Sequence, residues 1–248
     1  MIKHGGVMFE NQQLKVNDIK INYYEAGVGE TVLLLHGNSQ DGRIFREIFR
    51  QLARKLHVVA IDSRGHGLSE SGEMPFTIEQ FAEDILSFCH KKKLKNIVVI
   101  GYSDGANIGL YLNHLAPGLI TKLISISGNY QVQGIKKWFR LCVFILANCA
   151  RILALFSKKM QQYYWKLELI KKDIGLQQRD FKKMSQPTLI LTAQNDLIYM
   201  KHTIELHNSI ANSQLFVVKN SNHFNILSKK EAYVYIEKFL DITLESED

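Results

Sequence analysis

The sequence Gly-Tyr-Ser-Asp-Gly occupies residues 101–105, close to the middle of the 248-residue chain. The apolar, β-branched run at 96–100 (NIVVI) directly precedes it, and residues 106–112 (ANIGLYL) follow it with the pattern of an amphipathic helix. A G-x-S-x-G sequence between a strand and a helix is typical of a sharp, strained turn that exposes the serine hydroxyl at the edge of a sheet. Glycine at both ends leaves room for the helix to pack closely on the strand. The stretch therefore predicts a strand, a turn that carries Ser103, and a helix.

Strand-like and helix-like patterns alternate on both sides of this turn. Two strands joined by a turn at Asn17 and Asp18 are expected within residues 9–24. Further strands are expected at 31–35, 58–61, 96–100, 123–127, 187–193 and 214–218, and helices at 44–55, 77–90, 106–112, 203–210 and 228–240. Thr77 and Ser228 are the expected N-caps of two of these helices. Regular alternation predicts an α/β fold with a mostly parallel, doubly wound sheet and helices on both faces.

The net charge of +7 comes from one segment of the chain. Residues 130–183 contain 12 lysines and arginines but only 3 acidic residues, whereas the remaining 19 basic and 21 acidic residues leave the rest of the chain near −2. This excess does not form a recognition helix or a groove-shaped stripe, so no nucleic-acid partner is expected. The basic run at 91–93 lies at the expected end of a helix, where cations are favourable against the helix dipole.

The basic segment also interrupts the alternation, because it contains helical patterns and no strand pattern. Residues 130–183 are therefore expected to be a helical cap, inserted into a core made of residues 1–129 and 184–248. Residues 138–156 are apolar almost all round, with lysine pairs at 136–137 and 158–159 on either side. Two interpretations follow. One is a cap helix buried against the core, and the other is a lid whose apolar face lines an acyl pocket or contacts a lipid surface. The two overlap, because a lid can do both.

The cysteines and the N-terminal residues indicate a cytoplasmic protein. Cys89, Cys142 and Cys149 are an odd number without metal-ligand spacing, which predicts buried thiols in a reducing compartment and no metal site. Residues 1–6 lack the apolar run of a signal peptide. No run of about 18 apolar residues is present, so no membrane span is expected. Nothing in the sequence calls for a cofactor.

Chemically functional side chains follow several of the expected strands. His36, Asp62, Ser103, Asp196 and His223 each come directly after, or within the turn after, a strand. Because ligands in such sheets bind at the carboxyl ends of the strands, these residues are expected to gather along one rim.

The order of these motifs resembles the α/β-hydrolase superfamily, over nearly the whole chain except the cap. The motifs are His36-Gly37, then Asp62-x-Arg64-Gly65-x-Gly67-x-Ser69, then the G-x-S-x-G turn, Asp196 and His223. Nucleophile, acid and histidine occur in this order in the family. The resemblance implies that Ser103 is a nucleophile, with Asp196 and His223 as its partners. It also implies an oxyanion hole made of the backbone N–H groups of Asn38 and Asp104.

The chemistry of acyl transfer explains why these residue types are needed. A serine hydroxyl is a poor nucleophile unless a base accepts its proton, and histidine suits that task near neutral pH. A carboxylate must hold the imidazole in the correct tautomer. Of the nine histidines, His223 alone lies in a loop between the last strand and the terminal helix. His36 and His66 are expected to brace loops. Surface positions are expected for His57, His90, His114, His202 and His207. Asp62 is expected to hydrogen-bond the turn around Arg64.

The nucleophile also limits the reaction. Dehalogenases and epoxide hydrolases of this fold use an aspartate where this chain has Ser103. The expected reaction is hydrolysis of a small to medium carboxylic ester, thioester or lactone through an acyl-enzyme on Ser103, with a small acyl compound as substrate. The alternatives are a carbon–carbon bond hydrolase of the same fold, a non-catalytic receptor or scaffold, and a lipid- or membrane-associated binding protein that uses the basic, apolar cap.

Asp104 has two interpretations of its own. The sequence Gly-x-Ser-Asp-Gly resembles that of the biphenyl-hydrolase-like group, in which this carboxylate can meet a substrate ammonium group. The simpler interpretation is that Asp104 caps the helix that follows, where an anion is favourable.

Overall fold

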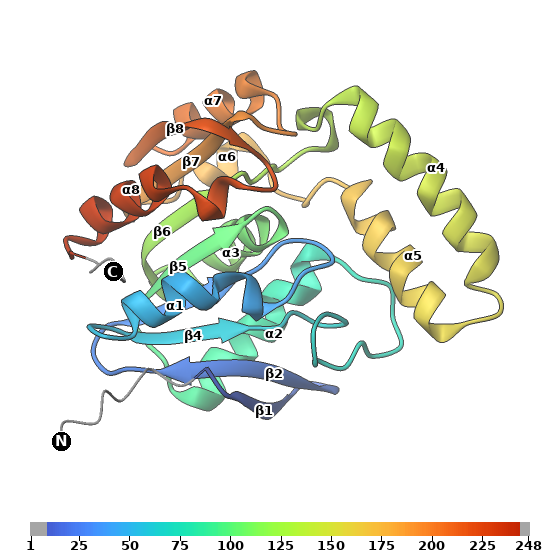
Figure 1. Cartoon of the computed structure of the whole chain (residues 1–248), viewed down its shortest axis with the longest axis horizontal. Coiled ribbons are helices and arrows are strands. Elements are labelled where there is room, and N and C mark those ends of the chain that lie inside the picture. The colour runs from blue at the N-terminus through green and yellow to red at the C-terminus, as the bar shows by residue number, and fades with distance from the viewer. Residues whose placement is uncertain (1–8, 244–248) are drawn as a thin grey trace.

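The computed structural model describes residues 9–243 and shows one eight-stranded sheet with helices on both faces (Figure 1). The strand order is β1-β2-β4-β3-β5-β6-β7-β8. The first two pairings, β1 with β2 and β2 with β4, are antiparallel, and all later pairings are parallel. This arrangement confirms the predicted α/β class. The stretch at 1–6, on which the signal-peptide argument depends, lies outside the described residues.

The elements alternate along the chain as expected. The strands are β1 (Asn11–Val16), β2 (Ile19–Ala26), β3 (Thr31–Leu35), β4 (His57–Ile61), β5 (Ile97–Tyr102), β6 (Ile120–Ile126), β7 (Thr188–Asn195) and β8 (Ser213–Asn222). The helices are α1 (Arg46–Leu52), α2 (Ile78–Lys92), α3 (Asp104–Leu115), α4 (Lys137–Leu153), α5 (Lys158–Ile170), α6 (Gln178–Phe181), α7 (Met200–Ser209) and α8 (Lys230–Leu240).

Strands β3 and β5 lie side by side in the centre of the sheet. Strand β3 pairs with β4 on one side and with β5 on the other, so the chain changes direction across the sheet at this point. Every residue of β5 is buried, as expected of a strand covered by helices on both faces. The carboxyl ends of β3 and β5 therefore meet where doubly wound sheets bind their ligands.

The helices bury their apolar faces in two separate clusters, one on each side of the sheet. Helices α1 and α8 contribute Phe49 and Ile236 to one cluster, whereas α2 and α3 contribute Phe81 and Ile108 to the other. The two layers hold the sheet between them, and they leave the carboxyl ends of the strands open toward α4 and α5 (Figure 1).

One of the two expected helix caps is present. The Thr77 hydroxyl accepts a hydrogen bond from the Gln80 backbone N–H at 3.0 Å and begins α2. The expectation for Ser228 is wrong, because α8 begins after Lys229 and has no side-chain cap. The Ser228 hydroxyl donates instead to the Asn225 carbonyl at 2.8 Å, within a short 3-10 turn.

Residues 130–183, the predicted cap segment, contain α4, α5, α6 and one 3-10 turn, and no strand lies among them. Helices α4 and α5 form a pair that extends away from the sheet (Figure 1). The two helices pack against each other through a small apolar cluster of Val143, Ala147, Ala150 and Leu167. The expectation of a helix buried against the core is wrong for the outer side of α4, because Leu141, Phe144 and Ile152 are more than half exposed.

The expectation of three buried thiols is correct for Cys89 alone. Cys142 and Cys149 are both exposed on α4. Among residues 9–243, no helix is both long and apolar enough to cross a lipid bilayer.

Candidate active site

Ser103 stands in a strained turn between β5 and α3. Its backbone has φ 53° and ψ −118°, a conformation that residues other than glycine rarely adopt. The Ser103 N–H donates to the Ile126 carbonyl at 2.8 Å, which ties the turn to the neighbouring strand β6. A side chain at Gly105 would place its Cβ 1.9 Å from the Leu35 carbonyl oxygen. Glycine is therefore required there so that α3 can start directly against β3.

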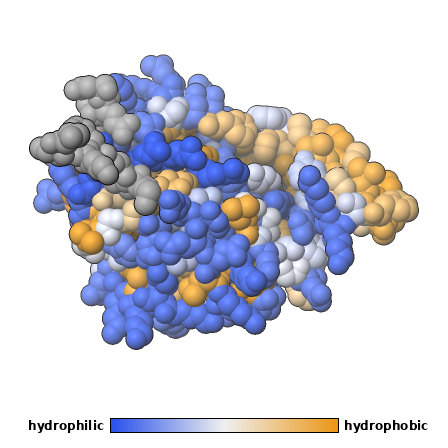
Figure 2. Space-filling view, turned by 60° about the horizontal axis from the view of Figure 1, so that its bottom comes forward, coloured by the Kyte–Doolittle hydropathy of each residue, from blue (hydrophilic) through white to orange (hydrophobic). Residues whose placement is uncertain are grey.

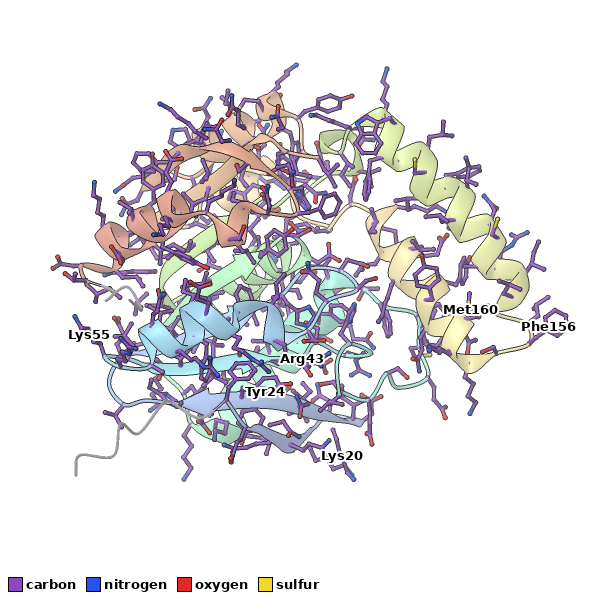
Figure 3. All side chains as sticks on the ribbon, in the orientation of Figure 1. Lys20, Tyr24, Arg43, Lys55, Phe156 and Met160 are labelled. Atoms are coloured by element: carbon purple, nitrogen blue, oxygen red, sulfur yellow. The ribbon has the colours of Figure 1, made fainter. Side chains whose placement is uncertain are left out.

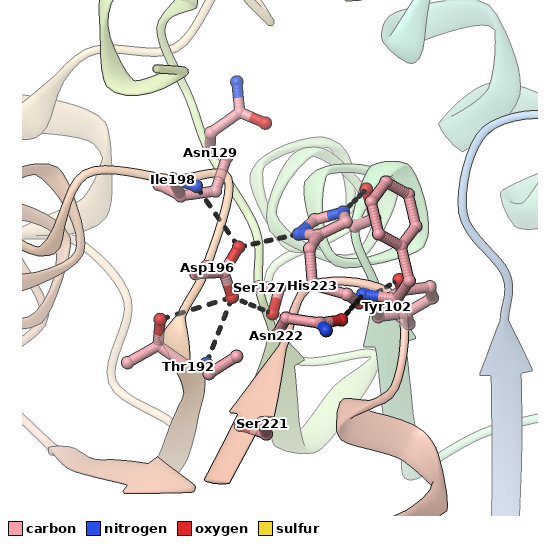
Figure 4. Close-up of polar contacts among 12 residues, drawn as sticks. Tyr102, Ser127, Asn129, Thr192, Asp196, Ile198, Ser221, Asn222 and His223 are labelled. Atoms are coloured by element: carbon pink, nitrogen blue, oxygen red, sulfur yellow. Dashed lines mark hydrogen bonds and ion pairs between the residues drawn. The ribbon is translucent and has the colours of Figure 1, made fainter. Parts of the chain in front are cut away.

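The structure brings Ser103, His223 and Asp196 together in one chain of hydrogen bonds. Figure 4 shows the part of this chain between His223 and Asp196. His223 Nε2 lies 3.1 Å from Ser103 Oγ, and His223 Nδ1 lies 2.7 Å from Asp196 Oδ1. Asp196 directly follows β7, and His223 directly follows β8. Residues that are 93 and 27 positions apart in the sequence thus meet, because three parallel strands end at the same rim.

The hydrogen bonds fix the proton on the His223 ring. A carboxylate accepts hydrogen bonds and cannot donate them, so the contact with Asp196 requires the proton on Nδ1. In neutral imidazole the other nitrogen then has a free lone pair. Nε2 can therefore accept a hydrogen bond from the Ser103 hydroxyl, which is the arrangement that a general base needs.

Asp196 is buried but well supplied with donors. Its Oδ2 accepts hydrogen bonds from the Ser127 hydroxyl at 2.5 Å and the Ala193 N–H at 3.1 Å, and its Oδ1 accepts from the Ile198 N–H at 3.2 Å. Burial by itself raises the pKa of this carboxyl. The hydrogen bond from His223 and the charge of that ring, together with the hydrogen bonds from Ser127 and Ala193, outweigh burial and lower the pKa below its ordinary value. Asp196 is therefore held as an anion behind the imidazole.

Two residues that sequence reasoning missed hold this arrangement in place. Ser127, at the end of β6, has φ 53° and aims its hydroxyl at Asp196. The Tyr102 hydroxyl donates to the His223 carbonyl at 2.5 Å and so anchors the loop that carries the imidazole (Figure 4). Neither contact could be found from the sequence, since a serine at the end of a strand and a tyrosine inside one have many ordinary roles.

The loop after β3 lies close to Ser103. A Cβ at Gly37 would lie 3.0 Å from Ser103 Cβ, so Gly37 allows the loop to lie against the serine. Asp104 is the first residue of α3, and N–H groups in the first turn of a helix have no partner within it. The backbone N–H groups at Asn38 and Asp104 therefore stay the predicted oxyanion donors.

The Asn38 side chain connects three parts of the site. Its Nδ2 donates to Asp104 Oδ2 at 3.0 Å and to the Lys166 carbonyl of α5 at 2.9 Å. The loop after β3, the start of α3 and the cap segment are thus tied at one amide. His36 supports the same loop, because its Nδ1 donates to the Gly37 carbonyl at 2.7 Å and its Nε2 accepts from the Ser63 N–H at 2.9 Å.

Asp104 is half-buried at the entrance to α3, beside Ser103. Burial raises the pKa of its carboxyl, and the hydrogen bond from Asn38 opposes that rise. One of its oxygens is engaged by Asn38, and the residue borders the cavity described below. Its position suits both predicted roles, as an anion at a helix N-terminus and as a group that faces substrate.

The motif after β4 forms no hydrogen bond with Ser103 among the described residues, and it has a structural role, as expected. Asp62 accepts from the Gly42 N–H at 2.7 Å and the Leu68 N–H at 2.9 Å, so it holds two turns. Arg64 forms buried hydrogen bonds with Asp84 and bonds to Asp18 as well. This motif therefore fixes the loop next to the site and does not take part in it.

A cavity of about 240 Å³ lies above Ser103. Its polar floor is formed by residues of the site, among them Asn38, Ser103, Asp104 and His223. Its walls are mostly apolar and come from the cap segment and nearby loops: Ile135, Phe139, Val143, Leu146, Leu167, Ile170, Leu197 and Ile198. The Ser103 side chain thus borders a mostly apolar chamber, to whose walls α4 and α5 contribute Phe139, Val143, Leu146, Leu167 and Ile170.

Comparison with known proteins agrees with this fold. The family description "alpha/beta hydrolase fold" matches residues 30–164, which include the Ser103 turn. The solved structure of a meta-cleavage product hydrolase from Pseudomonas fluorescens IP01 superposes with a TM-score of 0.76, at 14% identity, and the match covers 93% of this chain and 97% of that one.

Curated relatives match over shorter segments. A 2-(acetamidomethylene)succinate hydrolase of Mesorhizobium japonicum is 25% identical over 118 residues, which is 48% of this chain and 42% of that protein. A 1H-3-hydroxy-4-oxoquinoline 2,4-dioxygenase of Pseudomonas putida is 32% identical over 101 residues, which is 40% of this chain and 38% of that protein. The chain thus spans about two fifths of the length of these relatives, whose named reactions differ. The family match and the fold together show that this chain belongs to the α/β-hydrolase fold family.

Proposed function

We propose that this protein is a serine hydrolase that cleaves a small to medium carboxylic ester through an acyl-enzyme on Ser103. The observation that carries the proposal is the 3.1 Å contact between Ser103 Oγ and His223 Nε2, with Asp196 bound to the other ring nitrogen. This geometry supplies a nucleophile, a base and an orienting carboxylate at the floor of an apolar cavity.

In the acylation step, Ser103, His223, Asp196 and the two backbone N–H groups each have a separate role. The Ser103 oxygen attacks the ester carbonyl carbon while its proton passes to His223 Nε2. The carbonyl oxygen becomes an oxyanion, which accepts hydrogen bonds from the backbone N–H groups of Asn38 and Asp104. The tetrahedral intermediate collapses, the C–O bond to the alcohol breaks, and the proton on Nε2 passes to the departing alkoxide. Asp196 stabilises the imidazolium throughout.

Deacylation repeats these steps with water. A water molecule gives a proton to His223 Nε2 and adds its hydroxyl to the acyl carbon. The Ser103–acyl bond then breaks, and Ser103 takes back the proton from the imidazolium. The products are a carboxylic acid and a free enzyme. The apolar walls from α4 and α5 suit the hydrocarbon part of the acyl or alcohol group, because burying it there removes apolar surface from water.

The test is hydrolysis of p-nitrophenyl esters of increasing acyl length by purified protein. We expect turnover by the wild type, loss of at least about 10⁴-fold in Ser103→Ala, and a fluorophosphonate label that depends on Ser103. A panel with thioesters, lactones and a carbon–carbon bond substrate then defines the bond that is cleaved. Absence of both ester turnover and fluorophosphonate label in folded protein contradicts the proposal. A label on Ser103 without ester turnover would instead indicate that the cleaved bond is a thioester, a lactone or a carbon–carbon bond.

A further inference from the structure

The outer side of α4 and the turn after it expose an unusual number of large apolar side chains. Trp138, Leu141, Phe144 and Ile145 are between 54% and 60% exposed, and Ile152 is 62% exposed. In the turn after the helix, Leu155 is 79% and Phe156 is 83% exposed. Figure 2 shows an orange, hydrophobic surface at the end of the molecule where α4 and α5 lie in Figure 1. A surface of this kind on a single chain marks an interaction site.

The exposed residues form one stripe along α4. Trp138, Leu141, Ile145, Cys149 and Ile152 follow one another at steps of three or four, so they lie on the same side of the helix. The opposite side is closed, because Val143, Ala147 and Ala150 are buried against α5. Phe156 continues the surface at the tip, where it points away from the rest of the molecule (Figure 3). We define the outer face as these five stripe residues together with Phe144, Leu155 and Phe156.

Positive charge surrounds the outer face. Residues 136–159 contain six lysines and arginines and no acidic residue. Lys137, Arg151, Lys158 and Lys159 are exposed. The Lys171 ammonium lies 5.6 Å from the centre of the Phe144 ring, at the border between the apolar and basic surfaces. An apolar helix face with a tryptophan and a rim of lysine and arginine is typical of helices that lie in the interface of an anionic bilayer.

A second copy of this chain fits the outer face less well. A twofold dimer would bring the same face of each copy together. The six cations of each 136–159 segment would then meet their counterparts, without a carboxylate in the segment to neutralise them. Lipid phosphates supply the missing negative charge, and acyl chains accept the exposed aromatic and aliphatic side chains.

We propose that the outer face of α4 docks on an anionic lipid bilayer, with Trp138 and Phe156 inserted among the lipids. The active-site cavity is lined by the adjoining side of the same helix, through Phe139, Cys142 and Leu146. Cys142 and Leu146 are themselves exposed, so the cavity wall and the outer face are continuous. Docking therefore places the cavity next to the lipid phase, from which an apolar ester can enter. Membrane binding itself is independent of the proposed hydrolysis.

The test is flotation of the full chain with vesicles of phosphatidylcholine alone and with phosphatidylglycerol added. We expect binding to the anionic vesicles, weaker binding to neutral ones, and release by salt. The variant Leu141→Gln/Ile145→Gln/Ile152→Gln should lower the bound fraction at least about tenfold, because it removes three inserted side chains from residues that do not line the cavity. Glutamine keeps the helix propensity of α4.

A matched control separates docking from general surface hydrophobicity. The variant Val28→Gln/Met74→Gln/Val234→Gln removes three exposed apolar side chains elsewhere and should float like the wild type. Ser103→Ala should also float like the wild type, so that a failure of hydrolysis is distinguishable from a failure of docking. A blue shift of Trp138 emission on anionic vesicles, in a Trp165→Phe background, reports insertion directly.

Two results overturn the proposal. One is equal flotation of the wild type and the α4 variant, or no flotation of either, in protein that circular dichroism shows to be folded. The other is a dimer of the wild type in light scattering that the α4 variant converts to a monomer, without any binding to vesicles. That second result assigns the outer face to contact between copies.

Discussion

At the residue scale, two neighbours decide how well Ser103 and its partners are oriented. Ser127 donates to one Asp196 oxygen while His223 binds the other, so the carboxylate cannot rotate away from the imidazole. Tyr102 holds the His223 backbone at the same time. These contacts restrict the Asp196 and His223 side chains, and preorganisation of this kind accounts for much of catalysis in serine hydrolases.

Asp196→Asn should lower kcat about 10⁴-fold while protein stability changes little. The asparagine amide would donate a hydrogen bond to His223 Nδ1, and the ring proton would then move to Nε2. Nε2 could no longer accept the Ser103 proton. Steady-state kinetics with a p-nitrophenyl ester checks this expectation, and thermal unfolding serves as the control. Activity within tenfold of the wild type would mean that another carboxylate orients the imidazole.

Ser127→Ala should have a smaller effect of the same kind. A hydrogen bond to a charged group contributes about 1.5–3 kcal/mol, so loss of the Ser127 hydroxyl should lower kcat by about ten- to a hundredfold with little change in KM. Ser127→Thr, which keeps the hydroxyl, should recover part of the activity. An unchanged kcat in Ser127→Ala would show that the remaining donors hold Asp196 without it.

At the element scale, the contact between β3 and α3 sets the strained turn. Gly105 lies in the first turn of α3, where the Leu35 carbonyl approaches too closely for any side chain. The Asn38 side-chain amide connects this turn to α5, because it donates hydrogen bonds to Asp104 and to the Lys166 carbonyl. Ser103, the predicted oxyanion loop and the cap segment are therefore positioned by contacts between elements and not by any one loop.

Gly105→Ala should strongly destabilise the protein or prevent its folding. Its Cβ would overlap the Leu35 carbonyl oxygen at 1.9 Å, and backbone atoms on both sides resist displacement. Gly109→Ala in the same helix is the matched control, because its Cβ would meet only side-chain atoms, those of Leu123 at 2.9 Å and Val99 at 3.2 Å. Thermal unfolding compares the two variants. Equal melting temperatures would refute the explanation for Gly105.

At the scale of the whole molecule, several histidines are buried in neutral form. Burial lowers the pKa of His66 well below its ordinary value and lowers the pKa of His36 and His202 as well. His202 was expected at the surface, but it is buried and stacks on Tyr130 with ring centres 4.3 Å apart. Because of these buried histidines, the stability of the fold depends on pH.

The free energy of unfolding should fall as the pH drops below about 6.5, by up to about 1.4 kcal/mol per pH unit for each buried histidine. The unfolded chain binds protons at that pH, whereas the folded chain binds fewer because its histidines have lowered pKa values. The contribution of each buried histidine to stability is therefore fully present above the pKa that the histidine has in the unfolded chain. It is lost as the pH falls toward the lower pKa that the histidine has in the folded protein. Denaturant titrations across this range measure it, and His202→Gln should flatten the slope. A slope that is unchanged in that variant would exclude His202 as a contributor.

The sequence by itself determined the strand order along the chain and the positions of Ser103, Asp196 and His223 at strand ends. This was possible because local patterns mark strands and turns, and because parallel strands place their carboxyl ends at one rim. The contacts of Ser127, Tyr102 and Asn38 were decided only by tertiary structure, since they join segments far apart in the chain.

The need for tertiary contacts also explains why the sequence did not show that the outer side of α4 is exposed. Residues 138–156 are apolar almost all round, so periodicity could not show which side would be covered. Only the packing of α4 against α5 decided that one side is closed and that the other, with Leu141, Ile145 and Ile152, stays open to its surroundings. A helix without a polar face has its orientation fixed by its neighbours, and the sequence of the helix alone does not contain them.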